Sequence, residues 1–289
     1  YDPSVFVDIL NKDALEAIFQ LNTKTVRPYV KEIKPFSIPQ IAAITALVRP
    51  GALDAPCPNP EKADVTAAKY FVACAQGKEQ PYYIHEDLKP ILEETFGIIV
   101  YQEQTLQIYR DLAGYSFAQA EEVRRGIGKK DKDVLEKHGG ILKQKLLERG
   151  WKAQQADLLL ESIQASARYS FNKAHAVSYA IVAYNGCWLK KHYPLDFWMG
   201  ELTAHGDDVK KMISYLRECR KFLLPIDIFK SHVFEWKIEG EKLRPPLNLI
   251  KGCGAKGVQS IKNFLSSDDA ILEYIEENDT DAEMEHELE

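Results

Sequence analysis

Apolar side chains recur at helical spacing along most of this chain, and this period constrains the fold more than any other feature. Between residues 102 and 222, one segment after another places apolar residues three or four positions apart, as a helix with one buried face requires. In residues 174–191, the small residues Ala176, Ala180 and Ala183 share one face and predict a closely packed central helix. The sequence therefore predicts a mainly α fold built from many helices.

Capping and stop signals set the expected helix ends. Ser116 and Gln119 have the spacing of a capping box, so we expect a helix that begins at residue 117 and is ended by Gly126. Asp131 is the expected N-cap of a long helix that stops at Gly150. We also expect a short amphipathic turn or helix at residues 13–19 and helices at residues 38–47, 88–95, 102–113, 153–167 and 208–222.

Two segments favour extended structure. Residues 97–101 form a short apolar run that is compatible with a strand. Residues 224–238 mix alternating apolar residues with turns, which indicates a small β element. Because the chain changes character there, we expect a domain boundary between residues 222 and 245.

Composition excludes several classes of protein. Of the 289 residues, 45% are apolar, which is enough for a folded core. No apolar run approaches the roughly 20 residues of a membrane span, and the first residues lack the basic and apolar parts of a secretory signal. The five cysteines show no C-x-x-C spacing, so we expect neither a disulfide framework nor a cysteine zinc site.

The formal net charge of −6 depends on one terminal segment. Residues 267–289 hold eleven acidic residues and neither Lys nor Arg. Without this segment, 37 basic residues face 32 acidic ones, so residues 1–266 carry a net charge of about +5. The positive net charge of residues 1–266 is compatible with a polyanionic partner. The acidic segment at residues 267–289 is expected to be disordered.

The first candidate site is a cluster of cations around two glycines. It consists of Arg124, Arg125, Gly126, Ile127, Gly128, Lys129 and Lys130. Glycines allow a tight turn close to a ligand, guanidinium groups grip phosphate oxygens in pairs, and ammonium groups add charge. The cluster therefore suits a phosphate site. In the alternative interpretation, the arginines complement a helix dipole and the lysines are solvated surface residues.

The second candidate site begins at Asn172. This residue is a candidate N-cap, which would place Lys173 and His175 beside the free N–H groups of a helix start, where an anion is favoured. Tyr179 would share a helix face with His175. The alternative is a buried histidine that is hydrogen-bonded inside a helix bundle.

The third candidate is the glycine-rich segment at residues 252–257. It matches G-x-G-x-x-G, but the sequence around it cannot supply the paired parallel strands of a dinucleotide-binding fold. Half of a helix-hairpin-helix fits better. Its backbone amides at Gly252 and Gly254, together with Lys256, would face a DNA phosphate without reading base sequence.

Motifs of catalysis are absent from the sequence. It contains no H-E-x-x-H, no G-x-S-x-G, no spaced set of His and carboxylates for zinc, and no D-x-D pair. We therefore identify no nucleophile, no general base and no metal-binding residue in this chain.

Taken in order, the motifs resemble those of the family C replicative DNA polymerases, whose bacterial form is the DNA polymerase III alpha subunit. The resemblance rests on LVRPG at residues 47–51, GIIVYQEQ at 97–104, AGYS at 113–116, RRGIGKK at 124–130 and FNKAHA at 171–176. Further support comes from FQL at 19–21, HYP at 192–194, LPID at 224–227 and IKGCG at 250–254. The resemblance covers roughly residues 10–265.

The resemblance implies a division of the chain into four parts. Residues 1–50 would be the end of the palm and its junction with the fingers. Residues 51–222 would be the helical fingers domain, and residues 223–266 would hold the small β element and the first helix-hairpin-helix. Residues 267–289 would be the acidic tail.

The resemblance also implies a site and its partners. The fingers would bind an incoming deoxynucleoside triphosphate together with template-primer DNA in the cytoplasm of a bacterium or a phage-infected cell. Phosphate contacts would come from Arg124, Arg125, Lys129 and Lys130. The nucleotide pocket would be lined by Asn172, Lys173, His175 and Tyr179, with Arg49 supporting it and with Tyr101, Gln102 and Gln104 facing the nucleotide or the nascent base pair.

The catalytic part of such a polymerase is expected outside this chain. In the family, the aspartates that bind Mg²⁺ lie in the palm, and no D-x-D pair is present here, so the chain alone should be inactive. The remaining palm and thumb would be partners, as would the sliding clamp and the clamp loader through regions absent here. Because the chain begins with Tyr1 rather than Met, we interpret it as a piece of a longer or processed product.

Two other functions remain open from the sequence. One is a non-enzymatic DNA-binding module that grips the backbone through the glycine hairpin at residues 252–257. The other is a helical scaffold whose acidic tail mimics nucleic acid for a partner protein.

Overall fold

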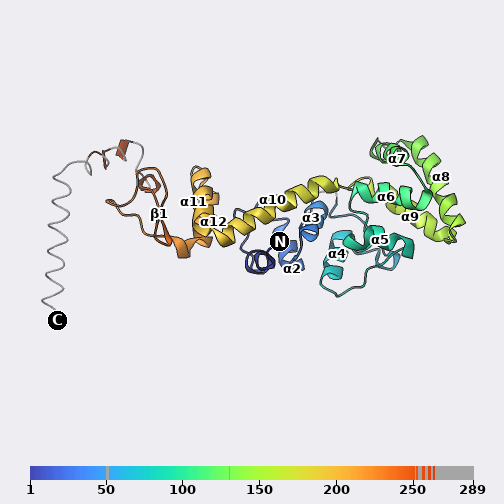
Figure 1. Ribbon diagram of the computed structural model, residues 1–289, viewed down its shortest axis with the longest axis horizontal. Helices are drawn as coiled ribbons and strands as arrows, with labels where there is room; N and C mark the ends of the chain where they lie inside the picture. Colours follow the sequence, from blue (N-terminus) through green and yellow to red (C-terminus); the bar gives the residue numbers. More distant parts are fainter. Residues whose placement is uncertain are drawn as a thin grey trace. The chain divides into compact units, whose positions relative to one another are not determined.

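The computed structural model describes residues 1–49, 52–129 and 131–250, followed by residues 252, 256, 257, 260, 261 and 263. The chain forms two compact units, Tyr1–Lys191 and His192–Glu289 (Figure 1). This division lies well before the boundary that we expected between residues 222 and 245. The assignment of the four sequence segments to palm, fingers, hairpin and tail stays a prediction.

Helices dominate the first unit, and the predicted mainly α fold is confirmed. Its regular helices are α1 (Pro3–Val5), α2 (Arg27–Ile33), α3 (Ile38–Leu47), α4 (Ala67–Ala75), α5 (Lys89–Leu92), α6 (Gln102–Ala113), α7 (Phe117–Lys129), α8 (Lys132–Glu148), α9 (Ala153–Ser166) and α10 (Lys173–His192). Short turns of other helix types are the π-helical η1 (Phe6–Leu10) and the 3₁₀ turns η2 (Pro60–Lys62), η3 (Glu86–Leu88) and η4 (Glu93–Thr95).

The second unit combines two helices with a small hairpin. Its elements are α11 (Pro194–Ala204), α12 (Val209–Glu218), the 3₁₀ turn η5 (Arg220–Phe222), β1 (Lys237–Glu239), β2 (Lys242–Arg244) and the 3₁₀ turn η6 (Leu247–Leu249). The two strands pair antiparallel with Ile238 opposite Leu243, and α11 packs against both. The expected small β element is therefore present, although the strands begin at the end of the predicted segment.

Local side-chain caps explain where several helices start. Ser37 and Asp131 accept backbone hydrogen bonds at the starts of α3 and α8. Before α7, Gln119 Oε1 accepts from Ser116 N at 2.9 Å, and Ser116 Oγ accepts from Gln119 N at 3.3 Å. These pairs satisfy N–H groups that a helix leaves without partners. The predicted caps at Ser116 and Asp131 are confirmed.

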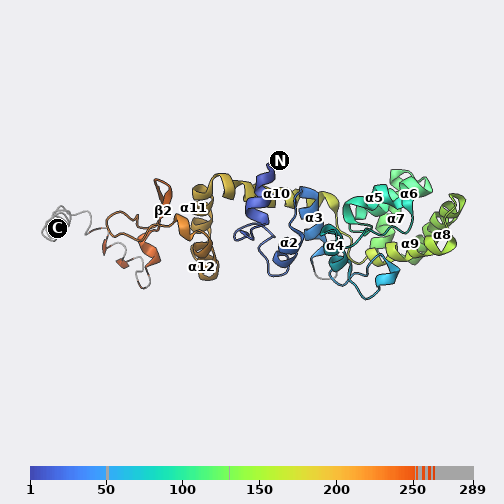
Figure 2. The same ribbon diagram turned by 90° about the horizontal axis from the view of Figure 1, so that it is seen from below.

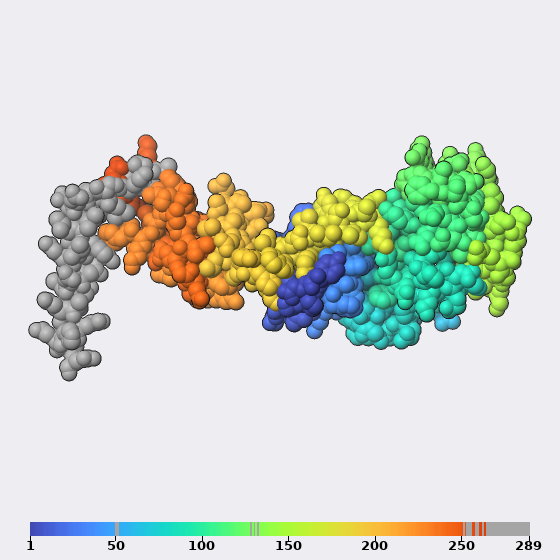
Figure 3. All heavy atoms as spheres, in the orientation of Figure 1, coloured from blue at the N-terminus to red at the C-terminus, as the bar shows by residue number. Residues whose placement is uncertain are grey.

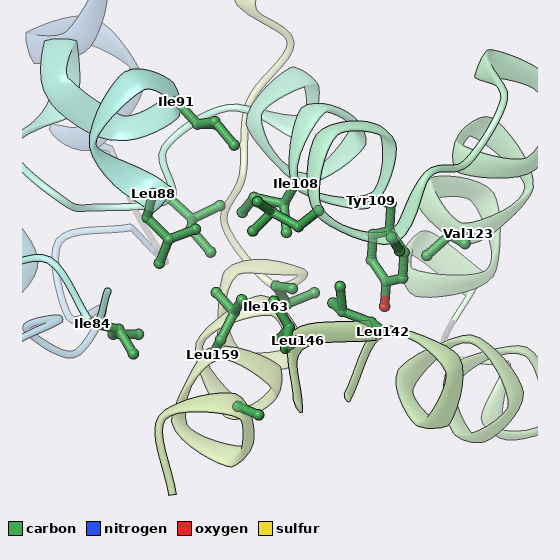
Figure 4. Close-up of a cluster of buried hydrophobic side chains, with 14 of the residues drawn as sticks. Ile84, Leu88, Ile91, Ile108, Tyr109, Val123, Leu142, Leu146, Leu159 and Ile163 are labelled. Atoms are coloured by element: carbon green, nitrogen blue, oxygen red, sulfur yellow. The ribbon is translucent and has the colours of Figure 1, made fainter. Parts of the chain in front are cut away.

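One large apolar core joins α6, α7, α8 and α9, which lie together in both ribbon views (Figures 1 and 2). Figure 4 shows Ile108 and Tyr109 of α6 facing Leu142, Leu146 and Ile163 from α8 and α9. Each such side chain contributes about 1.5–3 kcal/mol on full burial. This core fixes α7, which carries the predicted cation cluster, against α6 and α8.

The long helix α10 packs against the start of the chain. Figure 3 shows its yellow spheres lying against the blue spheres of the first residues. The N–H of Asp2 donates to the hydroxyl of Tyr184 at 2.7 Å, and Lys191 Nζ lies 2.8 Å from Asp8 Oδ2. Ala176, Ala180 and Ala183 are buried, so the predicted small-residue face of this helix is confirmed.

Two local predictions were wrong, those for residues 97–101 and for Gly126. Residues 98–100 form no strand, because the N–H groups of Val100 and Tyr101 bond to the side chain of Gln104 rather than to a neighbouring strand. Residues 13–19 form turns, with positive φ at Asp13 and Ala17, which is one of the two alternatives expected for this segment. Gly126 does not end a helix, because α7 continues through it to Lys129.

Gly126 allows α7 and α8 to pack closely and does not form a turn. A Cβ at this position would overlap the side chain of Val134 on α8, so only glycine lets the two helices approach this closely. Gly140 on α8 offers a matched comparison, because a Cβ there meets nothing within 4 Å.

We expect Gly126→Ala to lower the free energy of unfolding by about 1–3 kcal/mol, because the new methyl group forces α7 and α8 apart. Gly140→Ala should raise it by about 0.5–1 kcal/mol, because alanine is the better helix former at an open position. Urea denaturation of both variants measures the difference. Equal effects of the same sign would contradict this account of Gly126.

Candidate functional site

A backbone crossing brings together two segments that lie about seventy residues apart in sequence. Tyr101 and Phe171 form a parallel bridge, in which Phe171 N donates to Val100 O at 2.9 Å and Gln102 N donates to Phe171 O at 3.0 Å. Lys173 N then donates to Glu103 Oε2 at 2.9 Å. We call this region, residues 100–104 with residues 169–173, the junction. It places the first turn of α6 directly beside the start of α10.

Arg124 on α7 contacts the junction through Gln102. Its Nε and Nη2 donate to the two carboxylate oxygens of Glu121 at 2.8 and 2.7 Å, and its Nη1 donates to Gln102 Oε1 at 3.1 Å. Arg125 is mostly exposed, with its Nε 3.1 Å from Glu121 Oε1. One carboxylate therefore holds two arginines, and the three side chains together carry a net charge of +1.

These contacts keep Glu121 ionised. Hydrogen bonds from Arg124 and then from Arg125 lower the pKa of the Glu121 carboxyl to about 2. The same pairing with Glu121 raises the pKa of the Arg124 guanidinium. The pairing of Glu121 with Arg124 therefore favours the charged form of both side chains.

A small pocket of about 40 Å³ opens beside Arg124. It is lined by Gln102, Thr105, Arg124, Ile127, Ser166, Ala167 and Ser170. The volume suits one small group rather than a whole nucleotide. Hydroxyl and amide groups around a guanidinium are the donors that a phosphate oxygen accepts from.

Lys173 is the cation on the α10 side of the junction. Its Nζ lies 2.5 Å from Glu94 Oε1 and 5.6 Å from the centre of the Tyr101 ring. Asn172 Oδ1 accepts from His175 N at 2.8 Å, which confirms Asn172 as the predicted N-cap. The start of α10 is thus closed by a side chain, and its nearest cation is already paired with an acid.

Arg49, His175 and Tyr179 line a second and larger pocket. Arg49 Nε donates to Ala46 O at 2.8 Å, its Nη2 donates to Tyr169 O, and its Cζ lies 4.7 Å from the centre of the Phe171 ring. The pocket has a volume of about 230 Å³ and is lined by Gln20, Thr23, Val26, Thr45, Val48, Arg49, Phe171, His175, Ala176 and Tyr179. It shares no lining residue with the pocket beside Arg124.

Two predicted ligand contacts are buried in the structure. Gln104 is 2% exposed, and its carboxamide accepts from Val100 N and Tyr101 N and donates to Thr95 Oγ1 at 2.8 Å. Tyr101 is equally buried, and burial raises the pKa of its phenol. These side chains hold the first turn of α6 in place, so their part in the site is to position it.

The remaining predicted residues lie apart from these contacts or outside the described residues. Lys129 is exposed at the end of α7, and Lys130 lies outside the described residues. In the predicted DNA-binding hairpin, Gly252 has a φ of +87° and Lys256 is exposed, whereas Gly254 lies outside the described residues. DNA binding by this hairpin stays a prediction.

The structure adds acidic residues that the sequence reasoning did not include. Glu121 could have been found, because it stands three and four positions before Arg124 and Arg125 on a predicted helix. Glu94 and Glu103 carried no such signal, because their contacts with Lys173 span more than sixty residues. Only the backbone crossing brings them together.

Neither a metal centre nor a membrane span is found in the described part of the chain. Its His, Cys, Asp and Glu side chains form no group of three or more that could hold a metal ion. No helix there is long and apolar enough to cross a membrane.

We expect Gln104→Leu to lower the free energy of unfolding by about 2–4 kcal/mol, because it leaves buried N–H groups of Val100 and Tyr101 unpaired. Gln102→Leu should cost less than about 1 kcal/mol, because it removes one partly exposed hydrogen bond to Arg124. Urea denaturation compares the two. An equal loss of stability in both variants would contradict the conclusion that Gln104 supports the fold while Gln102 belongs to the site.

The Glu121 carboxylate predicts a pH dependence of stability. Because its pKa is lowered in the folded protein, its ion pair stabilises the fold above the usual carboxyl pKa, and this stabilisation disappears as the pH falls towards 2. The free energy of unfolding relative to a Glu121→Gln variant should therefore fall by about 1 kcal/mol between pH 6 and pH 2, since partial exposure screens the pair. Glu136→Gln, which removes an exposed carboxylate on α8, is the control.

Comparison with known proteins supports the family resemblance that the motifs indicated. Residues 1–150 match the family described as the bacterial DNA polymerase III alpha subunit finger domain. The chain is 32% identical over 269 residues to DNA polymerase III subunit alpha of Pasteurella multocida and 34% identical over 264 residues to that of Aquifex aeolicus. It is 31% identical over 263 residues to that of Escherichia coli.

These alignments cover 88 to 90% of this chain but 22% of each relative, so the chain spans about a fifth of the length of the curated relatives it matches. The family match extends over more than half of the chain. The chain therefore belongs to the bacterial DNA polymerase III alpha subunit family and contains its finger domain.

Proposed function

We propose that this chain binds the triphosphate of an incoming deoxynucleotide as the fingers portion of a replicative, DNA-directed DNA polymerase. The observation that carries the proposal is the convergence at the junction, where Nη1 of Arg124 on α7 donates to Gln102 Oε1. On the α10 side, the backbone N–H of Lys173 donates to Glu103, and the Lys173 ammonium lies 5.6 Å from the centre of the Tyr101 ring. Two cationic residues from helices far apart in sequence therefore lie at the start of α6. A polyphosphate needs several fixed cations of this kind.

Arg124 keeps free donors for a phosphate group. A guanidinium has five N–H donors, of which Glu121 and Gln102 engage three. One N–H remains on each terminal nitrogen, so the guanidinium keeps two donors for phosphate oxygens. Glu121 and Gln102 therefore orient Arg124 without using all of its donors.

The proposed contribution to catalysis is binding and orientation. Arg124, Arg125 and Lys173 would hold the phosphates of the nucleotide so that its α phosphorus faces the primer 3′-hydroxyl. Their positive charge would also stabilise the charge that develops as the phosphate bond breaks. The described residues offer no donor set for Mg²⁺, so we assign metal binding, and with it nucleotidyl transfer, to parts of the polymerase outside this chain.

Further partners follow from the same proposal. Template-primer DNA, the remaining palm and thumb, and the clamp proteins that serve such a polymerase would meet this chain in the bacterial cytoplasm. Lys129, Lys130 and the glycine hairpin at residues 252–257 are the proposed contacts for DNA or phosphate that the junction does not include. No described contact bears on them, so their roles rest on family membership.

The test is the binding of a fluorescent deoxynucleoside triphosphate to the full chain in the presence of Mg²⁺. The double variant Arg124→Gln with Arg125→Gln should weaken binding by at least about tenfold, because hydrogen bonds between ions contribute about 1.5–3 kcal/mol each. Arg110→Gln, which removes an exposed arginine from the far end of α6, is the matched control. Affinity that the double variant leaves unchanged would refute the assignment of the site.

A further inference from the structure

We propose that the exposed side of α12 is a docking surface for the acidic segment at residues 267–289 of this same chain. This surface, which we call the outer face of α12, consists of Val209, Lys210, Ile213 and Arg217 of the helix with Arg220 and Lys221 of the adjoining turn η5. All six residues are exposed. The proposal does not depend on nucleotide binding, because the junction belongs to the first unit and α12 to the second.

The opposite side of α12 is anchored in the second unit. The helix packs against α11, beside which it lies in both ribbon views (Figures 1 and 2). Tyr215 is buried, and its ring lies 5.8 Å from that of Trp198 on α11. Val209 and Ile213 are four positions apart, as are Ile213 and Arg217, so these side chains share one side of the helix. The outer face is therefore held in a fixed direction, away from the core.

The cations of the outer face lack ion pairs within the described part of the chain. Its two lysines and two arginines have no acidic partner there, whereas the neighbouring Lys211 lies 3.9 Å from Asp208. Glu218, the acidic residue of α12, is half-buried and is not part of the outer face. Val209 and Ile213 add aliphatic surface, 68% and 46% exposed. The outer face thus offers four positive charges around two apolar side chains.

The acidic segment has the complementary composition. Residues 268–277 read DDAILEYIEE, with five acidic residues, four large apolar residues and neither Lys nor Arg. Ile271 and Ile275 stand four positions apart, the same spacing as Val209 and Ile213. A segment with this pattern can cover the two aliphatic side chains and bring carboxylates to the cations around them.

The covalent connection also favours this occupant. Seventeen residues, 251–267, separate Ile250 from the first acid of the segment, Asp268. Fully extended, they span up to about 60 Å, which exceeds the radius of gyration of about 13 Å of a 100-residue domain. The segment can therefore reach the outer face of α12, which belongs to the same unit. A tethered segment has an effective concentration of the order of millimolar, so weak contacts suffice.

The apolar residues of the outer face distinguish an acidic peptide from nucleic acid. DNA phosphates could pair with the four cations but would leave Val209 and Ile213 in contact with water. An acidic and apolar peptide satisfies both kinds of group. Once docked, it neutralises the cations and withholds them from any competing polyanion. The acidic segment would therefore regulate which anions this side of the protein attracts.

Carbodiimide cross-linking of the full chain tests the contact, because this reagent joins a carboxylate to a lysine amine without a spacer. We expect mass spectrometry to find Lys210 and Lys221 linked, within one chain, to acids of residues 268–289. The double variant Arg217→Glu with Arg220→Glu should lower this yield at least about fivefold, because two attractions between exposed charges become repulsions.

Ile213→Asp is the second variant, because it removes the aliphatic contact at an exposed position and keeps all four cations. It should lower the same yield. Val182→Asp, which changes an exposed apolar side chain of α10, is the matched control and should leave the yield unchanged. A yield that neither the double variant nor Ile213→Asp lowers would overturn the proposal.

Other occupants of the outer face give different results, each of which would overturn the proposal. Links between two chains in place of links within one would identify a second copy. Links spread evenly over exposed lysines such as Lys34 and Lys78 would show that the segment has no preferred surface. If Lys210 and Lys221 gave no links but duplex DNA shielded them from acetylation, nucleic acid would be the occupant.

The cross-linking result is separate from the proposed function. The double variant Arg124→Gln with Arg125→Gln should leave the cross-link yield unchanged, because both arginines lie in the first unit. Weak triphosphate binding with intact cross-links would refute the proposed function alone. Tight triphosphate binding without the cross-links would refute the docking of the acidic segment alone.

Discussion

The candidate site depends on the pairing of Phe171 with the start of α6. The first N–H groups of a helix lack partners within the helix, and those at the start of α6 lie in a buried region. Phe171 O accepts from Gln102 N, while the Gln104 side chain accepts from Val100 N and Tyr101 N. Since each unpaired group would cost about 1–3 kcal/mol, this turn and the segment that crosses it stabilise each other. Residues seventy positions apart can therefore form one site.

Ion pairs with acidic side chains offset the positive charge of the cations at the junction. Arg124 and Arg125 share Glu121, and Lys173 pairs with Glu94. These carboxylates reduce the repulsion between neighbouring cations and limit the rotamers that each cation visits. They also compete with an incoming anion, so a ligand must offer more negative charge than one carboxylate does. A triphosphate meets this condition, whereas a single carboxylate does not.

Sequence reasoning succeeded where the signal is local. The helical period, the caps at Ser116, Asp131 and Asn172, and the small-residue face of α10 all concern residues a few positions apart. It failed where a choice depends on distant packing. Gln102 and Gln104 look alike in the sequence, yet only Gln104 turns inward, because Thr95 and the N–H groups of residues 100 and 101 surround it. The ion pair of Lys173 with Glu94 could not be predicted for the same reason.

The glycines of the cation cluster show how one motif can serve two physical needs. Beside Arg124 and Arg125, a glycine pair suggests a loop that wraps a phosphate, but the backbone stays helical through Gly126. The absence of a side chain at Gly126 lets Val134 of α8 approach α7. A larger residue would displace α7 relative to α8, and with it the direction in which Arg124 points towards Gln102. The glycine thus acts on the site through helix packing, and the arginines act on it through charge.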